Sequence, residues 1–165
     1  MDIDQKLQAG AEIVKEWVIS TSNPEVNRVD LVVAPENLKK AVAAMLDSQW
    51  GYLSAITGLD HPEYLTDETG VKKVDPDRGN LELLYHFSGG AAVLTLRVTL
   101  PYSEAVIDSI CDIDMAAQLY EREAAELFGI EFRGAPSTDH LVLPDDWPVG
   151  VYPLRKAFTG LKKES

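Results

Sequence analysis

Cysteine is nearly absent from this sequence, since Cys111 stands alone among 165 residues. One cysteine cannot form a disulfide within the chain, and it cannot supply the several thiolates that hold an iron–sulfur cluster. The few histidines, His61, His86 and His140, lie far apart and do not have the short spacing of a metal site. The sequence therefore predicts no cluster and no zinc site of its own, and it fits a reducing, cytoplasmic setting.

Positive charge is also in short supply, with 15 lysine and arginine residues against 27 aspartates and glutamates. The net charge of -12 opposes binding to nucleic acids and to anionic membranes, which depends on Lys and Arg. No window has the roughly 18 consecutive apolar residues that a membrane helix needs. The first four residues lack the positive charge of a signal peptide. We therefore expect no nucleic-acid binding, no direct membrane insertion and no export.

The chain nevertheless has enough apolar content for one buried core, since hydrophobic residues make up 45% of it. Residues 3–18 carry apolar side chains at three- and four-residue steps, which is typical of an amphipathic helix. A second helix is predicted from Pro35, a residue that suits a first turn, to Gly51. The segments around them are predicted to be a linker at 20–27 and strands at 29–33 and 52–59.

The most distinct local pattern is a β-hairpin. Apolar residues alternate with polar ones in residues 81–87 and again in residues 94–100. Between them, a Ser-Gly-Gly turn at residues 88–90 permits the positive φ angles of a tight reversal. Because these glycines belong to a turn and no dinucleotide fingerprint is present, we expect no bound nicotinamide. Residues 61–79 are polar and rich in turn formers, so they are predicted to form a loop.

A charged helix is predicted to follow the hairpin. It starts at Asp114, whose carboxylate can accept the first backbone donors, or alternatively at Asp112, and it ends at Gly129. Arg122 and Glu126 are spaced for an ion pair on one face of this helix. Such a charge cluster is often no more than a solvated face. The apolar pair directly after Glu126 indicates that part of this one is covered.

Beyond Gly129 the chain changes character. Prolines at positions 136, 144, 148 and 153 exclude a long helix, and a stretch of this length without periodicity is hard to fit inside a compact domain. Large apolar residues are spaced through it, so its composition is not that of a disordered segment. We predict that residues 1–129 form a two-layer α+β domain, with helices on one face of a mixed, largely antiparallel sheet. Residues 130–165 are predicted to form an extended partner-docking tail.

The same region carries an ordered set of motifs. These are Glu121-Arg122-Glu123, Glu126-Leu127-Phe128-Gly129-Ile130 with Phe132, Leu143-Pro144-Asp145-Asp146-Trp147, and Pro153-Leu154-Arg155-Lys156. In this order they resemble the signature of the C subunit of NADH-quinone oxidoreductase, which is also called the thirty-kilodalton subunit of respiratory complex I. That family includes the related subunit of membrane-bound energy-converting NiFe hydrogenases.

The resemblance implies a structural subunit of the hydrophilic arm that holds no cofactor. Iron–sulfur clusters and the quinone or NiFe centre are then expected in partner subunits. The implied partners are a large hydrogenase-like subunit, of the forty-nine-kilodalton type, and an iron–sulfur subunit. The implied location is the cytoplasmic face of the cell membrane, with the chain peripheral to it. The residues expected to bind partners are Glu121, Arg122, Glu123, Glu126, Phe128, Phe132, Asp145, Asp146, Trp147, Tyr152, Leu154, Arg155 and Lys156.

Other interpretations stay open at this point. The resemblance itself fits either a complex I subunit or its counterpart in an energy-converting hydrogenase. A stand-alone hydrolase could use paired carboxylates, either Glu121 with Glu123 or Asp145 with Asp146, as general acid and base. Carboxylates one or two positions apart on a helix point in different directions, which weighs against that enzyme. A soluble adaptor outside bioenergetics is a third alternative.

Overall fold

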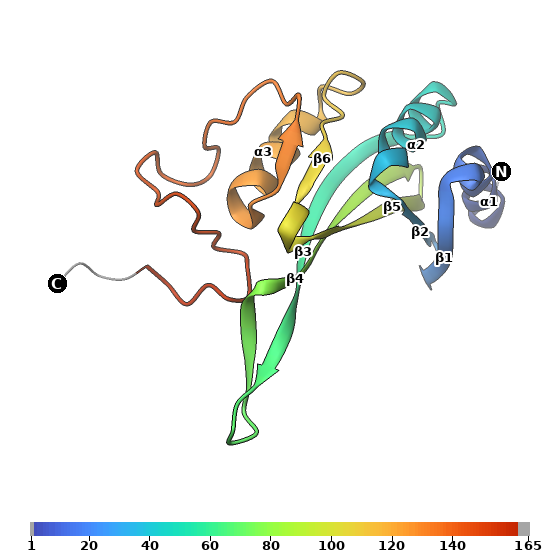
Figure 1. The fold of residues 1–165 in the computed structure, drawn as a ribbon. Coiled ribbons are helices and arrows are strands. Elements are labelled where there is room, and N and C mark those ends of the chain that lie inside the picture. Colours follow the sequence, from blue (N-terminus) through green and yellow to red (C-terminus); the bar gives the residue numbers. More distant parts are fainter. Residues whose placement is uncertain (1, 162–165) are drawn as a thin grey trace.

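The computed structural model describes residues 2–161, in which helices are interspersed among groups of strands (Figure 1). The main elements are α1 (Ile3–Val14), β1 (Val18–Glu25), β2 (Arg28–Val33), α2 (Pro35–Asp47), β3 (Tyr52–Thr66), β4 (Lys72–Gly89), β5 (Ala92–Pro101), β6 (Val106–Asp108), α3 (Ala117–Phe128) and β7 (Glu131–Arg133). Short 3-10 helices lie at Lys15–Trp17 and Tyr102–Glu104. In this described part, none of the helices has the length and apolarity to cross a membrane.

A five-stranded sheet in the order β1-β2-β5-β4-β3 organises the chain. Strands β2 and β5 are parallel, and the other neighbouring pairs are antiparallel. The three helices contribute to a single core on one face of this sheet. The predicted α+β class, with helices on one face of a mixed, largely antiparallel sheet, is therefore confirmed.

The core follows from the alternation in the predicted hairpin. Leu81, Leu83, Tyr85 and Phe87 of β4 have no exposed surface and point toward the helices. Their neighbours on β5, from Leu94 to Leu100, are buried on the same face. Burying one such leucine contributes about 2 kcal/mol, so this hairpin supplies much of the stability of the domain.

The other face of the sheet carries polar side chains, and none of the helices within residues 2–161 packs on it. Arg97 of β5 bridges Asp30 of β2 and Glu82 of β4, with N–O distances of 3.0 and 2.6 Å. His86 lies on this face with its ring 2.9 Å from the Thr95 hydroxyl. The ion pairs and hydrogen bonds satisfy groups that the neighbouring side chains largely bury.

Two segments predicted as irregular are strands, and those predictions were wrong. Residues 20–27, predicted as a linker, belong mostly to the edge strand β1. Residues 61–79, predicted as a loop, contain the ends of β3 and β4, which pair as far as Thr66 and Lys72 and form an arm beyond the sheet (Figure 1). Both segments are polar because both of their faces are exposed, and backbone pairing needs no apolar alternation.

Helix boundaries differ less from the predictions. α1 ends at Val14 and α2 at Asp47, a few residues earlier than predicted. α3 begins at Ala117 rather than at Asp114 or Asp112. Asp114 accepts a hydrogen bond from the Ala116 amide at 3.0 Å in the preceding turn, and Asp112 pairs with a lysine of α2.

The predicted end of α3 at Gly129 is confirmed, because this glycine has the left-handed φ of 74° that terminates helices. The chain then returns to the body of the domain as β7, which pairs in parallel with β6. The segment without helix or strand, which we call the tail, therefore begins after Arg133. The predicted division into a domain and a partner-docking tail at residue 130 stays a prediction. Residues 162–165 of the predicted tail lie outside the described residues.

α3 lies against the edge strand β3. The Tyr120 hydroxyl donates to the Ser54 carbonyl at 2.9 Å, and the Phe128 ring packs directly on Gly58. A Cβ atom at Gly58 would lie only 2.5 Å from that ring. The missing side chain at position 58 therefore determines how closely α3 approaches the sheet.

We predict that Gly58→Ala lowers the free energy of unfolding by about 1–3 kcal/mol, because the new methyl group overlaps a packed aromatic ring. Chemical denaturation measures this change. Phe128→Leu removes the overlap, so the double variant should lose less stability than the sum of the two single variants. Additive losses would show that Gly58 and Phe128 are not coupled.

Candidate partner-docking site

The tail folds back onto α3 through the side chain of Arg122. Its guanidinium donates to two consecutive backbone carbonyls, Asp139 O at 3.1 Å and His140 O at 3.0 Å. A guanidinium presents several donors in a fixed plane, so it can bind adjacent carbonyls at once. Arg122 thus fixes the position of the tail next to the middle of the helix.

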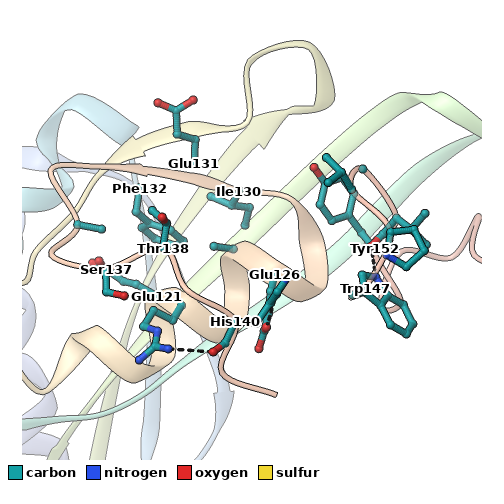
Figure 2. Close-up of a pocket in the computed structure, with 17 residues that line it drawn as sticks. Glu121, Glu126, Ile130, Glu131, Phe132, Ser137, Thr138, His140, Trp147 and Tyr152 are labelled. Carbon is teal, nitrogen blue, oxygen red and sulfur yellow. Dashed lines mark hydrogen bonds and ion pairs between the residues drawn. The ribbon is translucent and has the colours of Figure 1, made fainter. Parts of the chain in front are cut away.

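Glu126, one turn further along α3, binds backbone amides of the same loop, whereas Arg122 binds its carbonyls. Its carboxylate accepts hydrogen bonds from the amides of Leu141, Val142 and Leu143 at 3.0, 2.7 and 3.3 Å. It also lies 3.0 Å from the imidazole Nδ1 of His140. Figure 2 shows these two side chains next to each other. We call these contacts of Arg122 and Glu126 with residues 139–143 the loop clamp. The predicted ion pair between Arg122 and Glu126 is wrong, because each charge is used by the loop backbone instead.

The loop clamp controls the ionisation of Glu126, whose side chain is only 5% exposed. Burial by itself raises the pKa of this carboxyl. The hydrogen bonds from the amides of Val142 and Leu141 and from His140 stabilise the carboxylate and outweigh burial, so the pKa lies below its usual value. Glu126 is therefore a charged anchor at neutral pH.

Glu121 faces the opposite direction, into the domain, and is 1% exposed. Its carboxylate accepts from the Ser109 hydroxyl at 2.6 Å, the Ile110 amide at 2.8 Å and the Cys111 thiol at 3.2 Å. These bonds fix the segment that follows β6 against the first turns of α3. Because three donors occupy this buried carboxylate and Glu123 is exposed, the two glutamates do not form an acid–base pair around a pocket.

Cys111 is a packed residue in this buried network. Burial is the main reason that the pKa of its thiol rises to about 11, and the nearby Glu121 carboxylate raises it further, against a lowering hydrogen bond with Ser109. At neutral pH the side chain is therefore a thiol, which is a poor nucleophile and a poor metal ligand. In residues 2–161, no group of three or more His, Cys, Asp or Glu side chains is arranged to hold a metal ion.

A second stretch of the tail closes the C-terminal end of α3. The Leu154 amide donates to the Leu127 carbonyl at 3.1 Å, and Arg155 Nε donates to the Phe128 carbonyl at 2.7 Å. The last carbonyls of a helix have no partner within it and attract positive charge. Residues of the predicted partner motif thus cap the helix of their own chain.

Aromatic rings hold Arg155 in place. Its guanidinium carbon lies 4.4 Å from the ring centre of Tyr102 and 5.2 Å from that of Tyr152, distances at which a cation is attracted to a ring. Tyr152 in turn covers Gly129, where a Cβ atom would lie 2.4 Å from its ring. Gly129 therefore serves both the turn and the packing of the tail.

Asp60 of β3 makes a further link between the sheet and the tail. Its carboxylate accepts a hydrogen bond from the Lys156 amide at 2.7 Å and another from the Tyr102 hydroxyl. Burial first and then the bond to Asp60 raise the pKa of Tyr102, so its hydroxyl stays protonated and remains a donor. No sequence pattern pointed to Asp60 or Tyr102, because each lies far along the chain from the motifs.

A pocket of about 270 Å³ lies between α3, β7 and the tail. Figure 2 shows Ile130 and Phe132 on one side of it and Trp147 and Tyr152 on the other. The Trp147 indole donates to the Val151 carbonyl at 2.8 Å, which holds the tail segment in a closed turn. We call this space the α3–tail pocket.

The structure brings the predicted partner-binding residues together around α3 and the tail, with different degrees of exposure. The buried ones are Glu121, Phe128 and Phe132, the half-buried ones are Arg122, Glu126, Trp147, Tyr152 and Arg155, and the exposed ones are Glu123, Asp145, Asp146, Leu154 and Lys156. Their contact with a partner remains a prediction. Residues 139–142 and Ser109 complete the arrangement and carry no motif that would have identified them.

The family model for the respiratory-chain NADH dehydrogenase, 30 Kd subunit, matches residues 31–164. The chain belongs to this family. Its members are subunits of multi-subunit respiratory or hydrogenase complexes.

Curated relatives come from both branches of the family. The C subunit of the F(420)H(2) dehydrogenase of Methanosarcina mazei is 35% identical over 114 residues, which are 68% of this chain and 63% of that protein. The membrane-bound hydrogenase subunit beta of Pyrococcus furiosus is 27% identical over 145 residues, 78% of this chain and 84% of that protein. The C/D subunit of the NADH-quinone oxidoreductase of Methylococcus capsulatus is 38% identical over 65 residues, 39% of this chain but only 11% of that longer protein.

Solved structures share the fold of the chain. A chain of the membrane-bound sulfane sulfur reductase, an archaeal respiratory membrane complex, superposes with a TM-score of 0.70 at 22% identity, over 92% of this chain and 84% of that one. A trypsin-resistant fragment of Nqo5 gives a TM-score of 0.59 at 22% identity, over 83% of this chain and 99% of that one. These likenesses support the fold described above.

We predict that Glu126→Gln weakens the loop clamp and costs about 1–3 kcal/mol, because an amide group replaces a carboxylate that accepts several backbone donors. Amide hydrogen exchange of residues 141–143 should accelerate, whereas it should not in the exposed control Glu123→Gln. The stabilising charge is present above the unfolded pKa of about 4.3 and is lost as the pH falls through the lower folded pKa. The stability difference between wild type and Glu126→Gln should therefore shrink in acid; a difference independent of pH would contradict this.

Cys111 should react with iodoacetamide at neutral pH far more slowly than a free cysteine, because the native thiol is buried and its pKa is about 11. Mass spectrometry follows the alkylation. The rate should approach that of the free amino acid once denaturant unfolds the chain. Rapid alkylation of the native protein would contradict the buried network around Glu121.

Proposed function

We propose that this chain is a structural subunit, without a redox centre, in the hydrophilic arm of a complex I-type NADH:quinone oxidoreductase. In this proposal it docks on the large hydrogenase-like subunit and lies near an iron–sulfur subunit. The observation that carries the proposal is the use of the charged motif residues: Arg122, Glu126 and Arg155 hold the tail of their own chain. These bonds hold α3 and the tail in a fixed arrangement, which gives the chain a surface of defined shape for a partner.

Several exposed apolar side chains lie along that surface. Val149 is fully exposed, Leu154 is 51% exposed and Val142 is 62% exposed, and they share the surface with the charged Asp145 and Asp146. Exposed apolar residues grouped with polar ones are typical of protein interfaces. They support a docking role for the folded tail.

The side chains that could carry redox chemistry are occupied in other ways. Cys111 is buried and protonated beside Glu121, and clusters of iron and sulfur need several thiolates. We propose that electrons pass through iron–sulfur clusters and a quinone or NiFe centre in neighbouring subunits. The chain would then be peripheral to the cytoplasmic face of the membrane through the complex that it joins.

In some relatives a similar segment is part of a longer protein, which supports the proposal that this chain binds a large partner. The Methylococcus capsulatus protein carries a double designation, C/D, and is mostly outside the matched segment. We propose that a connection made covalently in that protein is made by noncovalent docking here. Two protein units that are joined in one relative are good candidates for neighbours in another.

The alternative is the equivalent subunit of a membrane-bound energy-converting NiFe hydrogenase. The similarity to the Pyrococcus furiosus hydrogenase subunit beta favours it, because the match extends over 84% of that protein. The docking surface would be the same in both cases, and the partner would differ in whether it holds a quinone site or a NiFe centre. A stand-alone hydrolase is not proposed, since Glu121 is buried and fully engaged.

The proposal is tested by affinity purification of the tagged chain from its own host, with mass spectrometry of the stoichiometric partners. A hydrogenase-like large subunit and an iron–sulfur subunit should co-purify, and their metal content should separate the two alternatives. A chain that purifies alone from gently solubilised membranes, or that binds a metal or flavin itself, would overturn the proposal.

We predict that Arg122→Ala lowers the yield of the co-purified large subunit at least several-fold, because residues 139–140 lose their anchor while the sheet keeps its core. Lys40→Ala, an exposed change on α2, is the matched control. Thermal melting of the isolated variants should show that both remain folded. Full assembly by Arg122→Ala would contradict the role of the loop clamp in docking.

A further inference from the structure

The surface of the α3–tail pocket is mostly apolar. Ala125 of α3, Phe132 of β7 and Ile130 between these elements line it, as do Trp147, Val149 and Val151 of the tail. Polar and charged side chains complete the lining: Glu121, Arg122, Glu126, Glu131, Ser137, Thr138 and His140. An apolar cavity of roughly 150 Å³ is enough to bind benzene. The pocket of about 270 Å³ therefore has room for one aromatic or long aliphatic side chain.

The walls of the pocket are held in place before anything enters it. The loop clamp fixes one end of the tail segment through Arg122 and Glu126. At the other end, Tyr152 packs on Gly129, and the Trp147 indole is bonded to the Val151 carbonyl. A preformed site loses little conformational entropy on binding, so more of the contact energy appears as affinity.

Acidic residues lie in and beside the pocket lining, and we call them its rim. Glu131 lines the pocket. The tail segment 134–154, which supplies much of the lining, contains Asp139, Asp145 and Asp146 close to lining residues in the sequence and has no lysine or arginine. All three aspartates are exposed, as is Glu131 on β7. The nearby Arg122 does not offset them fully, because its guanidinium is engaged with loop carbonyls. A ligand with positive charge beside its apolar group would complement this rim.

We infer that the α3–tail pocket receives one large apolar side chain from a segment of the hydrogenase-like subunit that carries lysine or arginine beside it. The inference rests on the proposed function and adds the chemistry of the contact. The apolar side chain fills the pocket, and the basic groups pair with the rim aspartates. A second copy of this chain is a poor occupant, since its charge of -12 would repel the acidic rim.

A photo-crosslink identifies the occupant directly. Benzoylphenylalanine replaces Val149, which is exposed at the rim, in the tagged chain, and the complex is irradiated and digested. The crosslinked peptide should come from the hydrogenase-like subunit and contain Lys or Arg within a few residues of a large apolar residue. The control position Ile19, exposed on β1, should not give that peptide. A crosslink from position 149 to a second copy, to lipid or to a peptide without basic residues would overturn the inference, as would no crosslink.

Pocket filling and rim charge give an independent test. Ala125→Phe occupies the pocket from within, and Ala91→Phe in the exposed β4–β5 turn is the size-matched control. Val149→Lys and Val149→Asp change the rim charge at a fully exposed position. We expect Ala125→Phe to lower the recovered large subunit at least tenfold, and Val149→Lys to lower it more than Val149→Asp, most clearly at low salt.

The outcomes separate this inference from the proposed function. If wild type does not recover the hydrogenase-like subunit, the proposed function fails. If wild type recovers it and a folded Ala125→Phe protein recovers equal amounts, only the pocket inference fails. Should Ala125→Phe not fold, equal recovery by Val149→Lys and Val149→Asp at low salt would overturn it instead.

Discussion

Arg122 and Glu126 lie one turn apart on α3 and bind opposite groups of the same loop backbone, carbonyls for the arginine and amides for the glutamate. A hydrogen bond to a charged group contributes roughly 1.5–3 kcal/mol, so the loop clamp is strong enough to order a segment that has no secondary structure. Leu154 and Arg155 of the tail in turn cap the C-terminal end of α3. Helix and tail therefore stabilise each other.

The position of this unit is set by the rest of the domain. Gly58 lets Phe128 approach the sheet, and the buried Glu121 ties the first turns of α3 to the segment after β6. Two adjacent charged residues thus make contacts on different sides of α3. Glu121 bonds to the segment after β6 inside the domain, and Arg122 bonds to the tail. A surface built in this way keeps its shape without a partner, which suits a subunit whose proposed contribution is docking.

The sequence predicted the parts of the fold that alternate or repeat, such as the hairpin around Gly89 and the end of α3 at Gly129. It did not predict β1 or the arm formed by β3 and β4, because strands exposed on both faces have no apolar period. It singled out motif residues of α3 and the tail, but it did not point to Asp60, Tyr102 or Ser109, and it did not predict the hydrogen bonds that the motif residues make. The spacing of Arg122 and Glu126 pointed to an ion pair, and nothing local shows that residues 139–143 offer carbonyls and amides in the order that satisfies both charges.

Hydrogen exchange with mass spectrometry, comparing the free chain with the chain in its purified complex, shows whether the loop clamp orders the tail before docking. Residues 141–143 should already be protected in the free chain, and added protection on assembly should concentrate in residues 144–154. Unprotected amides at 141–143 in the free chain, or new protection confined to the open face of the sheet, would contradict this.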